Sequence, residues 1–113
     1  MGRDLAKGDL PILILVVLSE GACHGYAVAR EIERRSERLF SMREGSLYPA
    51  LRVLEQDGFI EGSWDVETGG NARKVYSLTQ LGRAELAKRQ QEWRKYAETF
   101  AHILGGSRDA QKA

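Results

Sequence analysis

Apolar and polar residues alternate in blocks that predict three helices in the first half of the chain. Residues 10–19 (LPILILVVLS) are apolar on nearly every side, which predicts a buried helix. Residues 26–37 carry an apolar stripe that includes Tyr26 on one side and charged residues on the other, which predicts a half-exposed helix. A third, amphipathic helix is expected to begin at Ser46 and to stop before Gly58.

Pro49 stands near the start of this third helix. With Ser46 as N-cap it occupies the third helical position, where the backbone N–H has no carbonyl partner within the helix. The proline therefore removes no helical hydrogen bond, and its fixed φ stiffens the first turn. At about 100° per residue the helix divides into two faces. The apolar face comprises Leu47, Ala50, Leu51 and Leu54, and the opposite face comprises Tyr48, Pro49, Arg52 and Gln56.

The second half of the chain predicts a hairpin followed by one long helix. Residues 59–66 and 72–78 have strand-like composition, and they are joined by ETGGN, which is a turn signal. The following helix is expected to be capped by Thr79 and to end at Gly105 and Gly106. The predicted fold is mainly α with a small β-hairpin: a winged helix-turn-helix domain over residues 1–78, a C-terminal dimerisation helix over 79–106 and a disordered tail over 107–113.

This layout indicates which side chains would face DNA. In a winged helix-turn-helix the third helix enters the major groove and the hairpin touches the flanking backbone. Arginine recognises a guanine edge, glutamine an adenine edge, and a tyrosine hydroxyl a phosphate oxygen. The alternative is that Tyr48 packs on a neighbouring element and Arg52 is an ordinary solvated charge. The candidate DNA-binding residues at this helix are Arg43, Ser46, Tyr48, Pro49, Arg52 and Gln56.

Arg73 and Lys74 form a second candidate DNA-binding cluster, directly after the hairpin turn. Adjacent basic side chains at that position can bind phosphates, or their charge can protect an edge strand from pairing with another sheet. Residues 1–78 carry ten basic and twelve acidic residues, a net charge of −2. This charge favours a rival interpretation, a winged-helix module that binds protein rather than DNA. DNA contacts therefore have to be few and local.

Composition narrows the other possibilities. The chain has 113 residues, a net charge of +1 and one cysteine, so we expect a single cytoplasmic unit without a disulfide framework. Its longest apolar run, residues 10–18, has nine residues, whereas a membrane span needs about 20. The sequence holds no nucleophile with a base, paired carboxylates or phosphate loop, so it predicts neither an enzyme nor a cofactor. Cys23, His24 and His102 leave a metal-responsive regulator as an alternative, although a structural zinc site usually takes four clustered ligands.

Three stretches resemble the PadR family of bacterial transcriptional repressors: LPILILVVLSEGACHGYAVAREIE, GSLYPALRVLEQDGFIEGSW and GGNARKVYSLTQLGRAEL. The pattern LYPAL-x-x-LE-x-x-G-x-I followed by RK-x-Y-x-LT-x-x-G is much more specific than a general helix-turn-helix. A single helix after the wing resembles the short subfamily, in which that helix and the first helix form a two-fold dimer. The resemblance implies a DNA-binding repressor that a small molecule releases from its operator.

The long helix carries an apolar stripe of its own. Leu86, Trp93 and Phe100 recur every seven residues, and the stripe is completed by Ala97, Ile103 and Leu104. Packing of this stripe on a second copy would form a homodimer. Such a dimer presents two reading helices to a palindromic operator whose half-sites are about 34 Å apart. The alternative is that the stripe folds back on its own chain.

Trp93, in the stretch QQEWRKY, resembles the tryptophan at the matching place in multidrug-binding PadR-like repressors, where indoles from two subunits sandwich flat aromatic ligands. A paired indole site would bind such ligands through stacking and burial. Trp93 and the nearby Tyr96 are therefore candidate effector-binding residues, although a tryptophan at a heptad position is ordinarily interface core. The predicted function is a homodimeric repressor of a neighbouring operon, released by a small aromatic effector.

Overall fold

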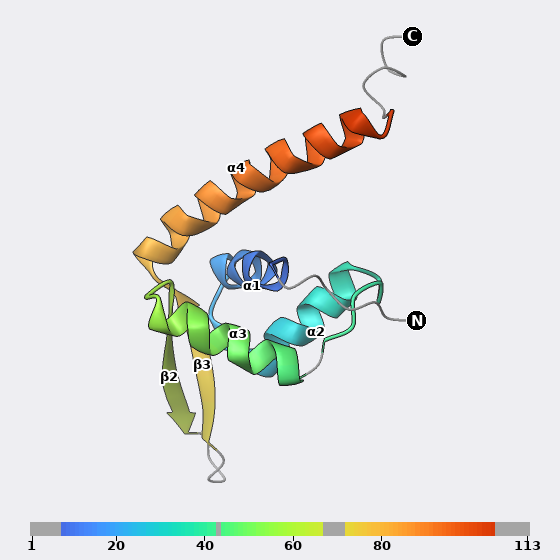
Figure 1. Ribbon diagram of the computed structural model, residues 1–113. Coiled ribbons are helices and arrows are strands. Elements are labelled where there is room, and N and C mark those ends of the chain that lie inside the picture. Colours follow the sequence, from blue (N-terminus) through green and yellow to red (C-terminus); the bar gives the residue numbers. More distant parts are fainter. Residues whose placement is uncertain (1–7, 43, 67–71, 106–113) are drawn as a thin grey trace.

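The computed structural model describes residues 8–42, 44–66 and 72–105. Three helices pack together, a β-hairpin extends to one side of them, and a fourth helix projects away (Figure 1). This arrangement confirms the predicted class, mainly helical with a small antiparallel sheet. The elements in chain order are α1 (Leu10–Ser19), β1 (Cys23–His24), α2 (Gly25–Arg35), α3 (Glu44–Gln56), β2 (Ile60–Val66), β3 (Ala72–Leu78) and α4 (Gln80–Ile103).

The sheet has three strands rather than the two predicted, in the order β1-β3-β2. The unpredicted strand, β1, pairs with β3 through Cys23↔Tyr76 and His24↔Val75, and this pairing ties the start of α2 to the hairpin. It lies in GACHG and is only two residues long, which is too short to produce an alternating pattern. β2 and β3 form the predicted hairpin, and its turn, residues 67–71, lies outside the described residues.

α3 begins two residues earlier than predicted, at Glu44, so Ser46 is not its N-cap. Pro49 therefore lies in the second turn, where it removes the hydrogen bond that would otherwise reach the carbonyl of Gly45. Gly45 is exposed, and apart from its chain neighbours and the backbone of its own helix no described atom lies within 4 Å of the place where its Cβ would be. Water can therefore satisfy that carbonyl, which makes a proline at this position tolerable.

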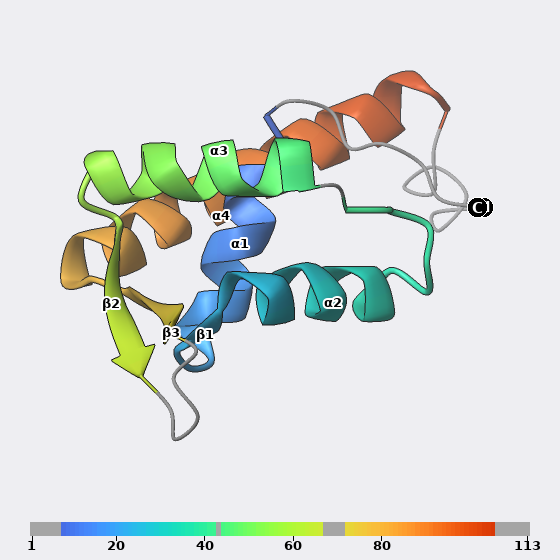
Figure 2. The ribbon, with the colours of Figure 1, turned by 90° about the horizontal axis from the view of Figure 1, so that it is seen from below.

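The core is formed almost wholly by aliphatic side chains, with α1 passing behind α2 and α3 (Figure 2). No polar or charged side chain is buried among the described residues, so the side-chain hydrogen bonds between elements lie at or near the surface. The buried residues are Leu10, Ile14, Leu15, Val17 and Leu18 from α1, Val28, Ala29 and Ile32 from α2, Leu47, Leu51 and Leu54 from α3, together with Ile60, Tyr76 and Leu86.

A close contact joins the start of α4 to the end of α3 and the start of β2. Thr79 caps α4 as predicted, because its Oγ1 accepts a hydrogen bond from the N–H of Gly82 (2.9 Å) and donates one to the carbonyl of Gly58 (2.6 Å). Its backbone N–H donates to the carbonyl of Phe59 (3.1 Å). A Cβ on Gly82 would lie 2.0 Å from that Phe59 oxygen, so only glycine allows α4 to approach so closely.

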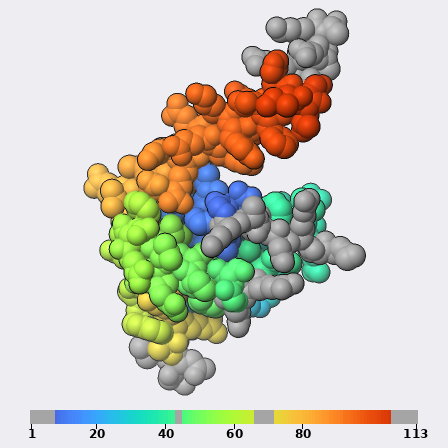
Figure 3. All heavy atoms as spheres, in the orientation of Figure 1, coloured from blue at the N-terminus to red at the C-terminus, as the bar shows by residue number. Residues whose placement is uncertain are grey.

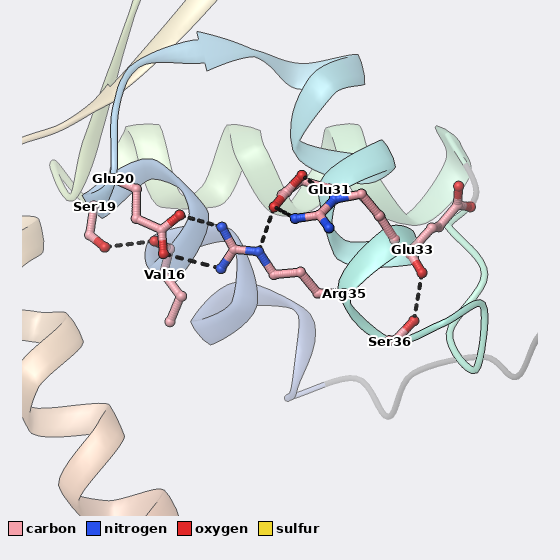
Figure 4. Close-up of polar contacts among 8 residues, drawn as sticks. Val16, Ser19, Glu20, Glu31, Glu33, Arg35 and Ser36 are labelled. Atoms are coloured by element: carbon pink, nitrogen blue, oxygen red, sulfur yellow. Dashed lines mark hydrogen bonds and ion pairs between the residues drawn. The ribbon is translucent and has the colours of Figure 1, made fainter.

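Arg35 connects α2 to the end of α1 (Figure 4). Its guanidinium donates to the carboxylate of Glu20, just after α1, and to Oε2 of Glu31 at 2.6 Å. Arg34 donates to the same Glu31 oxygen, also at 2.6 Å. Hydrogen bonds from Arg34 and then Arg35 lower the pKa of the Glu31 carboxyl to about 2. The Arg35–Glu20 pair joins the first two helices outside the apolar core, whereas the pairs with Glu31 lie within α2.

Gly82→Ala is expected to destabilise the protein by about 2 kcal/mol, because the added methyl meets backbone atoms that cannot move aside. Urea denaturation followed by circular dichroism measures the change. Gly45→Ala is the matched control, since it adds the same methyl to a helix in open space and should raise stability by up to about 1 kcal/mol. Equal effects of the two substitutions would contradict the role given to Gly82.

Glu31→Gln is expected to lower stability most above about pH 5, and the difference from the parent should shrink as the pH falls toward 2. The folded-state pKa lies below the ordinary value of 4.5, so the carboxylate stabilises the fold above 4.5 and this contribution is lost as the pH falls through the folded value. Thermal unfolding at a series of pH values, with Glu98→Gln on α4 as control, measures the effect. A difference that persists unchanged at pH 2 would rule out an ionic origin.

Candidate nucleic-acid interface

α3 presents a polar face to solvent, opposite the side that the core holds. Leu47, Leu51 and Leu54 anchor the helix, each with an exposed fraction of 2% or less. Tyr48 rests against Gly25 yet keeps an exposed fraction of 39%, so it is not packed away on a neighbouring element. The structure places the predicted residues of this face at the surface: Ser46, Tyr48, Pro49, Arg52 and Gln56. The remaining prediction near this helix, Arg43, lies outside the described residues.

α2 adds residues to this surface that the sequence interpretation missed. The apolar pattern predicts Tyr26 in the buried stripe, whereas it is 62% exposed because Gly25 occupies the buried position at the start of the helix. The hydroxyl of Tyr26 accepts a hydrogen bond from Arg30, whose guanidinium lies 5.4 Å from the centre of the tyrosine ring. Arg30 and Arg34 lie four residues apart on α2, and this spacing is the signal that could have placed them on one helix face. Arg38 continues the interval but lies beyond the end of the helix.

A hollow of about 1040 Å³ separates α2 from the start of α3. Figure 2 shows α3 above α2, with α1 between and behind them. Residues of the turn that follows α2 also line the hollow. Its lining combines acidic and basic groups with apolar side chains of the turn and of α3. The lining residues are Tyr26, Ala27, Ala29, Arg30, Glu31, Glu33, Arg34, Arg38, Phe40, Ser41, Met42, Leu47 and Tyr48. The start of α3 therefore adjoins a margin of mixed charge, in which Glu31 is already paired with Arg34 and Arg35.

Two side chains fix the turn between α2 and α3. The hydroxyl of Ser36 donates to the carbonyl of Glu33 (3.1 Å) and accepts from the backbone N–H four residues later (3.1 Å). The Glu33 carboxylate accepts from the backbone N–H of Met42 (2.9 Å). Glu37 and Arg38 adopt φ values of 52° and 68°, a left-handed conformation that costs about 1–2 kcal/mol per residue. The hydrogen bonds offset this strain and hold Arg38 beside the hollow.

The two basic residues predicted on the hairpin, Arg73 and Lys74, have different environments. Arg73 is exposed and lies opposite Asp65 in the register of β2 and β3. Lys74 is turned toward α3, where its Nζ donates to Oε1 of Glu55 at 3.0 Å. This hydrogen bond to a carboxylate raises the pKa of Lys74. The prediction assigns both residues the same role, whereas the structure engages Lys74 within the protein, because successive residues of a strand point to opposite faces.

α4 leaves most of its apolar stripe uncovered and stands away from the body of the molecule (Figure 3). The rings of Trp93, Tyr96 and Phe100 are at least half exposed and stack in sequence, with centroids 5.4 and 5.9 Å apart. Leu86 differs from its predicted partners, since it is only 7% exposed and belongs to the core of its own chain. At Leu86 the stripe therefore packs on its own chain, which is the alternative to dimerisation that the sequence leaves open. The other predicted residues are half-buried Ala97 and exposed Ile103 and Leu104.

A groove of about 330 Å³ lies beside Trp93, between α1 and α4. Apolar side chains of α1 line one wall, and the indole of Trp93 lines the other. Polar groups occur at its edges, so the groove combines an aromatic surface with a few hydrogen-bonding groups. The lining residues are Asp9, Ile12, Leu13, Val16, Phe40, Gln90, Trp93 and Arg94.

The residues considered for a metal site are dispersed. Cys23 and His24 lie in β1, and His102 lies in the last turn of α4. Within the described residues, no group of three His, Cys, Asp or Glu side chains is arranged to hold a metal ion. Burial, with a contribution from Glu31, raises the pKa of the Cys23 thiol.

None of the helices described is long and apolar enough to cross a membrane.

The three packed helices, the hairpin and the exposed third helix together define a winged helix-turn-helix protein. A model of the Transcriptional regulator PadR-like family matches residues 14–88. The chain therefore belongs to the PadR-like family of transcriptional regulators, which confirms the resemblance seen in the sequence. Members of this family regulate transcription and are not enzymes, in agreement with the prediction.

Relatives and solved structures agree with this assignment. A transcriptional regulator of Mycobacterium tuberculosis is 32% identical over 104 residues, which cover 92% of this chain and 91% of that protein. A PadR family transcription regulator from Clostridium difficile has a TM-score of 0.74 and 32% identity, covering 86% of this chain and 99% of that chain. Bacillus subtilis PadR in complex with operator DNA has a TM-score of 0.66 and 27% identity, covering 72% of this chain and 47% of that chain. The Bacillus subtilis protein is named a negative transcriptional regulator.

Proposed function

We propose that this protein binds operator DNA through α3 and the adjoining residues of α2 and β3. The observation that carries the proposal is the outward face of α3, where Tyr48, Arg52 and Gln56 are exposed while three leucines hold the helix in the core. The complex of Bacillus subtilis PadR with operator DNA supports the proposal, because that protein shares this fold over 72% of the chain.

In the proposed complex α3 lies in the major groove. Arg52 and Gln56 reach base edges, where a bidentate arginine selects guanine and a bidentate glutamine selects adenine. Tyr48 donates its hydroxyl to a phosphate oxygen, and Arg43 before the helix adds a positive charge. Residues of α2 contact the backbone, since the first helix of a helix-turn-helix crosses it. Tyr26 and Arg30 are the α2 side chains placed for this, and Arg73 reaches a phosphate from the hairpin.

We propose further that two copies form a homodimer through α4. An exposed aromatic and aliphatic face on a projecting helix supports this assembly, because water contact with so much apolar surface is unfavourable. The face consists of Trp93, Tyr96, Phe100, Ile103 and Leu104. A two-fold dimer would match a palindromic operator with half-sites about 34 Å apart, or one turn of DNA. Repression of a neighbouring operon follows by analogy with the negative regulator of Bacillus subtilis.

Release from the operator is assigned to a small aromatic effector at Trp93. The groove between α1 and α4 supports this assignment, since it offers the indole face beside apolar side chains of α1. A flat ligand there would be held by stacking and burial, with Tyr96 next to the indole. Such a ligand favours release only if it binds one arrangement of the two subunits better than the other.

The DNA interface is tested by two single substitutions. Arg52→Ala should reduce discrimination at one base-pair position by about 1–3 kcal/mol. Arg73→Ala should weaken binding to all sequences and reduce the slope of log K against log salt by about 0.9 for each subunit, or about 1.8 for the dimer. Fluorescence anisotropy with the protein's own promoter fragment and a scrambled fragment, at several salt concentrations, measures both quantities.

Lys88→Ala is the control for these substitutions, because it removes a positive charge from the exposed surface of α4. If neither Arg52→Ala nor Arg73→Ala changes operator binding, the assigned interface is wrong. If the parent protein retains no promoter fragment even at low salt, the chain acts instead as a winged-helix module that binds protein.

Dimerisation is tested by Phe100→Glu, which places a charge in the apolar face of α4 and should give a monomer in sedimentation velocity. Gln91→Glu is the matched control, since it adds the same charge nine residues earlier, about 180° around the helix. The Gln91→Glu variant should remain a dimer.

The effector site is tested by ligand binding. In a Trp64→Phe background, flat aromatic ligands should quench the fluorescence of Trp93, and Phe100→Glu should abolish that signal if the site needs both subunits. A Trp93→Ala variant that binds the ligand as tightly as the parent would disprove the effector site.

A further inference from the structure

Lys74 occupies an enclosed place between the hairpin and α3. Its Nζ lies 3.0 Å from Oε1 of Glu55, 5.9 Å from the ring centre of Trp64 and 5.5 Å from that of Tyr76. The two charged side chains keep only 30% and 32% of their surface exposed. A lysine with this environment has one carboxylate and two aromatic rings as partners before any DNA arrives.

Gly62 makes this arrangement possible. In the register of the hairpin Gly62 lies opposite Tyr76, and Trp64 lies opposite Lys74, so all four positions share one face of β2 and β3. A Cβ on Gly62 would lie 2.4 Å from Cε of Lys74 and 3.3 Å from Oε2 of Glu55. The lysine stem therefore passes over the glycine on its way to α3, through space that any other residue would fill.

The contact with Glu55 adds to two other attachments of the hairpin. At the base, Thr79 bonds to the carbonyls of Gly58 and Phe59. Farther along β3, Val75 and Tyr76 pair with β1. The Lys74–Glu55 contact differs from these because it joins side chains of the third residue of β3 and the last turn of α3, so it bears directly on the direction in which the hairpin extends from α3 (Figure 1).

We propose that Lys74 is a positioning residue: through Glu55 it sets the angle between the hairpin and α3, and the phosphate contact of the hairpin belongs to Arg73. The DNA-binding part of this inference rests on the proposed function. The Lys74 ammonium has three N–H donors, and the one directed at Glu55 holds it beside a carboxylate. A phosphate bound to the same ammonium would lie close to that carboxylate, which repels it.

Glu55→Gln distinguishes the two roles by the sign of its effect. If Lys74 only positions the hairpin, the substitution loosens the hairpin and lowers operator affinity by about threefold relative to the control. If Lys74 is a phosphate ligand, the substitution frees it for DNA and raises affinity above the control. Asp57→Asn is that control, because it removes the same charge two residues away and reports the long-range effect of one less negative group.

Gly62→Ala tests the same proposal without changing any charge. The new methyl displaces the flexible end of Lys74 and should lower operator affinity as much as Glu55→Gln does, with a salt slope equal to that of the parent. Ser63→Ala, on the next residue of β2, is the control and should leave affinity unchanged. Operator affinity at the parental level in Gly62→Ala would overturn the proposal.

A measurement without DNA separates this proposal from the proposed function. In a Trp93→Phe background, 5-fluorotryptophan reports only on Trp64, whose ring lies over the Lys74 ammonium. The fluorine resonance should shift or broaden in Glu55→Gln and in Gly62→Ala, and should stay at the parental position in Asp57→Asn. An unchanged resonance in both of the first two variants would overturn the positioning role, whether or not the protein binds DNA. A changed resonance with operator affinity equal to that of Asp57→Asn would overturn its link to DNA binding.

Discussion

The contact between Gly82 and the Phe59 carbonyl determines where the long helix leaves the winged domain. Thr79 stabilises that contact by capping α4 and by bonding to the carbonyls of Gly58 and Phe59, which lie between α3 and β2. The same point therefore fixes the base of the hairpin and the root of α4. In a dimer built on α4, the separation of the two α3 helices depends on this angle. In such a dimer, a change at the subunit interface would reach α3 through this joint and through the packing of α4 on α1.

Apolar and polar side chains stabilise different aspects of this fold, because the core is almost wholly aliphatic. Aliphatic packing holds the helices together but is non-directional, so it leaves their relative orientation only loosely specified. Directional contacts at the surface supply the missing specification. Arg35 joins α2 to the end of α1, Ser36 shapes the turn before α3, and Lys74 joins the hairpin to α3. Each of these residues looks from its sequence position like an ordinary solvated group.

Periodicity predicts the long elements well because their patterns extend over several turns. It predicts α1, α4 and the Thr79 cap, and it separates the buried leucines of α3 from Tyr48 and Arg52. It fails where one contact outweighs the pattern: β1 is too short to show a period, and Gly25 displaces Tyr26 from the buried stripe. Lys74 is misjudged for a related reason, since its partner Glu55 lies 19 residues away and only the folded hairpin brings them together.

The net charge of residues 1–78 understates the basic character of the surface that would face DNA. Glu31 and Glu55 each form ion pairs with basic residues, and the Glu33 carboxylate accepts a hydrogen bond from the backbone of the turn before α3. These acidic groups therefore stabilise the fold. The side chains of Arg52 and Arg73 stay exposed on the two elements proposed to contact the operator, and Arg30 is exposed on α2. A negative total is therefore compatible with DNA binding, but it limits each domain to a few phosphate contacts. A single domain with so few contacts would bind weakly. Two domains joined through α4, as proposed, would raise that affinity through their effective concentration, so the proposed roles of the exposed aromatic face and of α3 depend on each other.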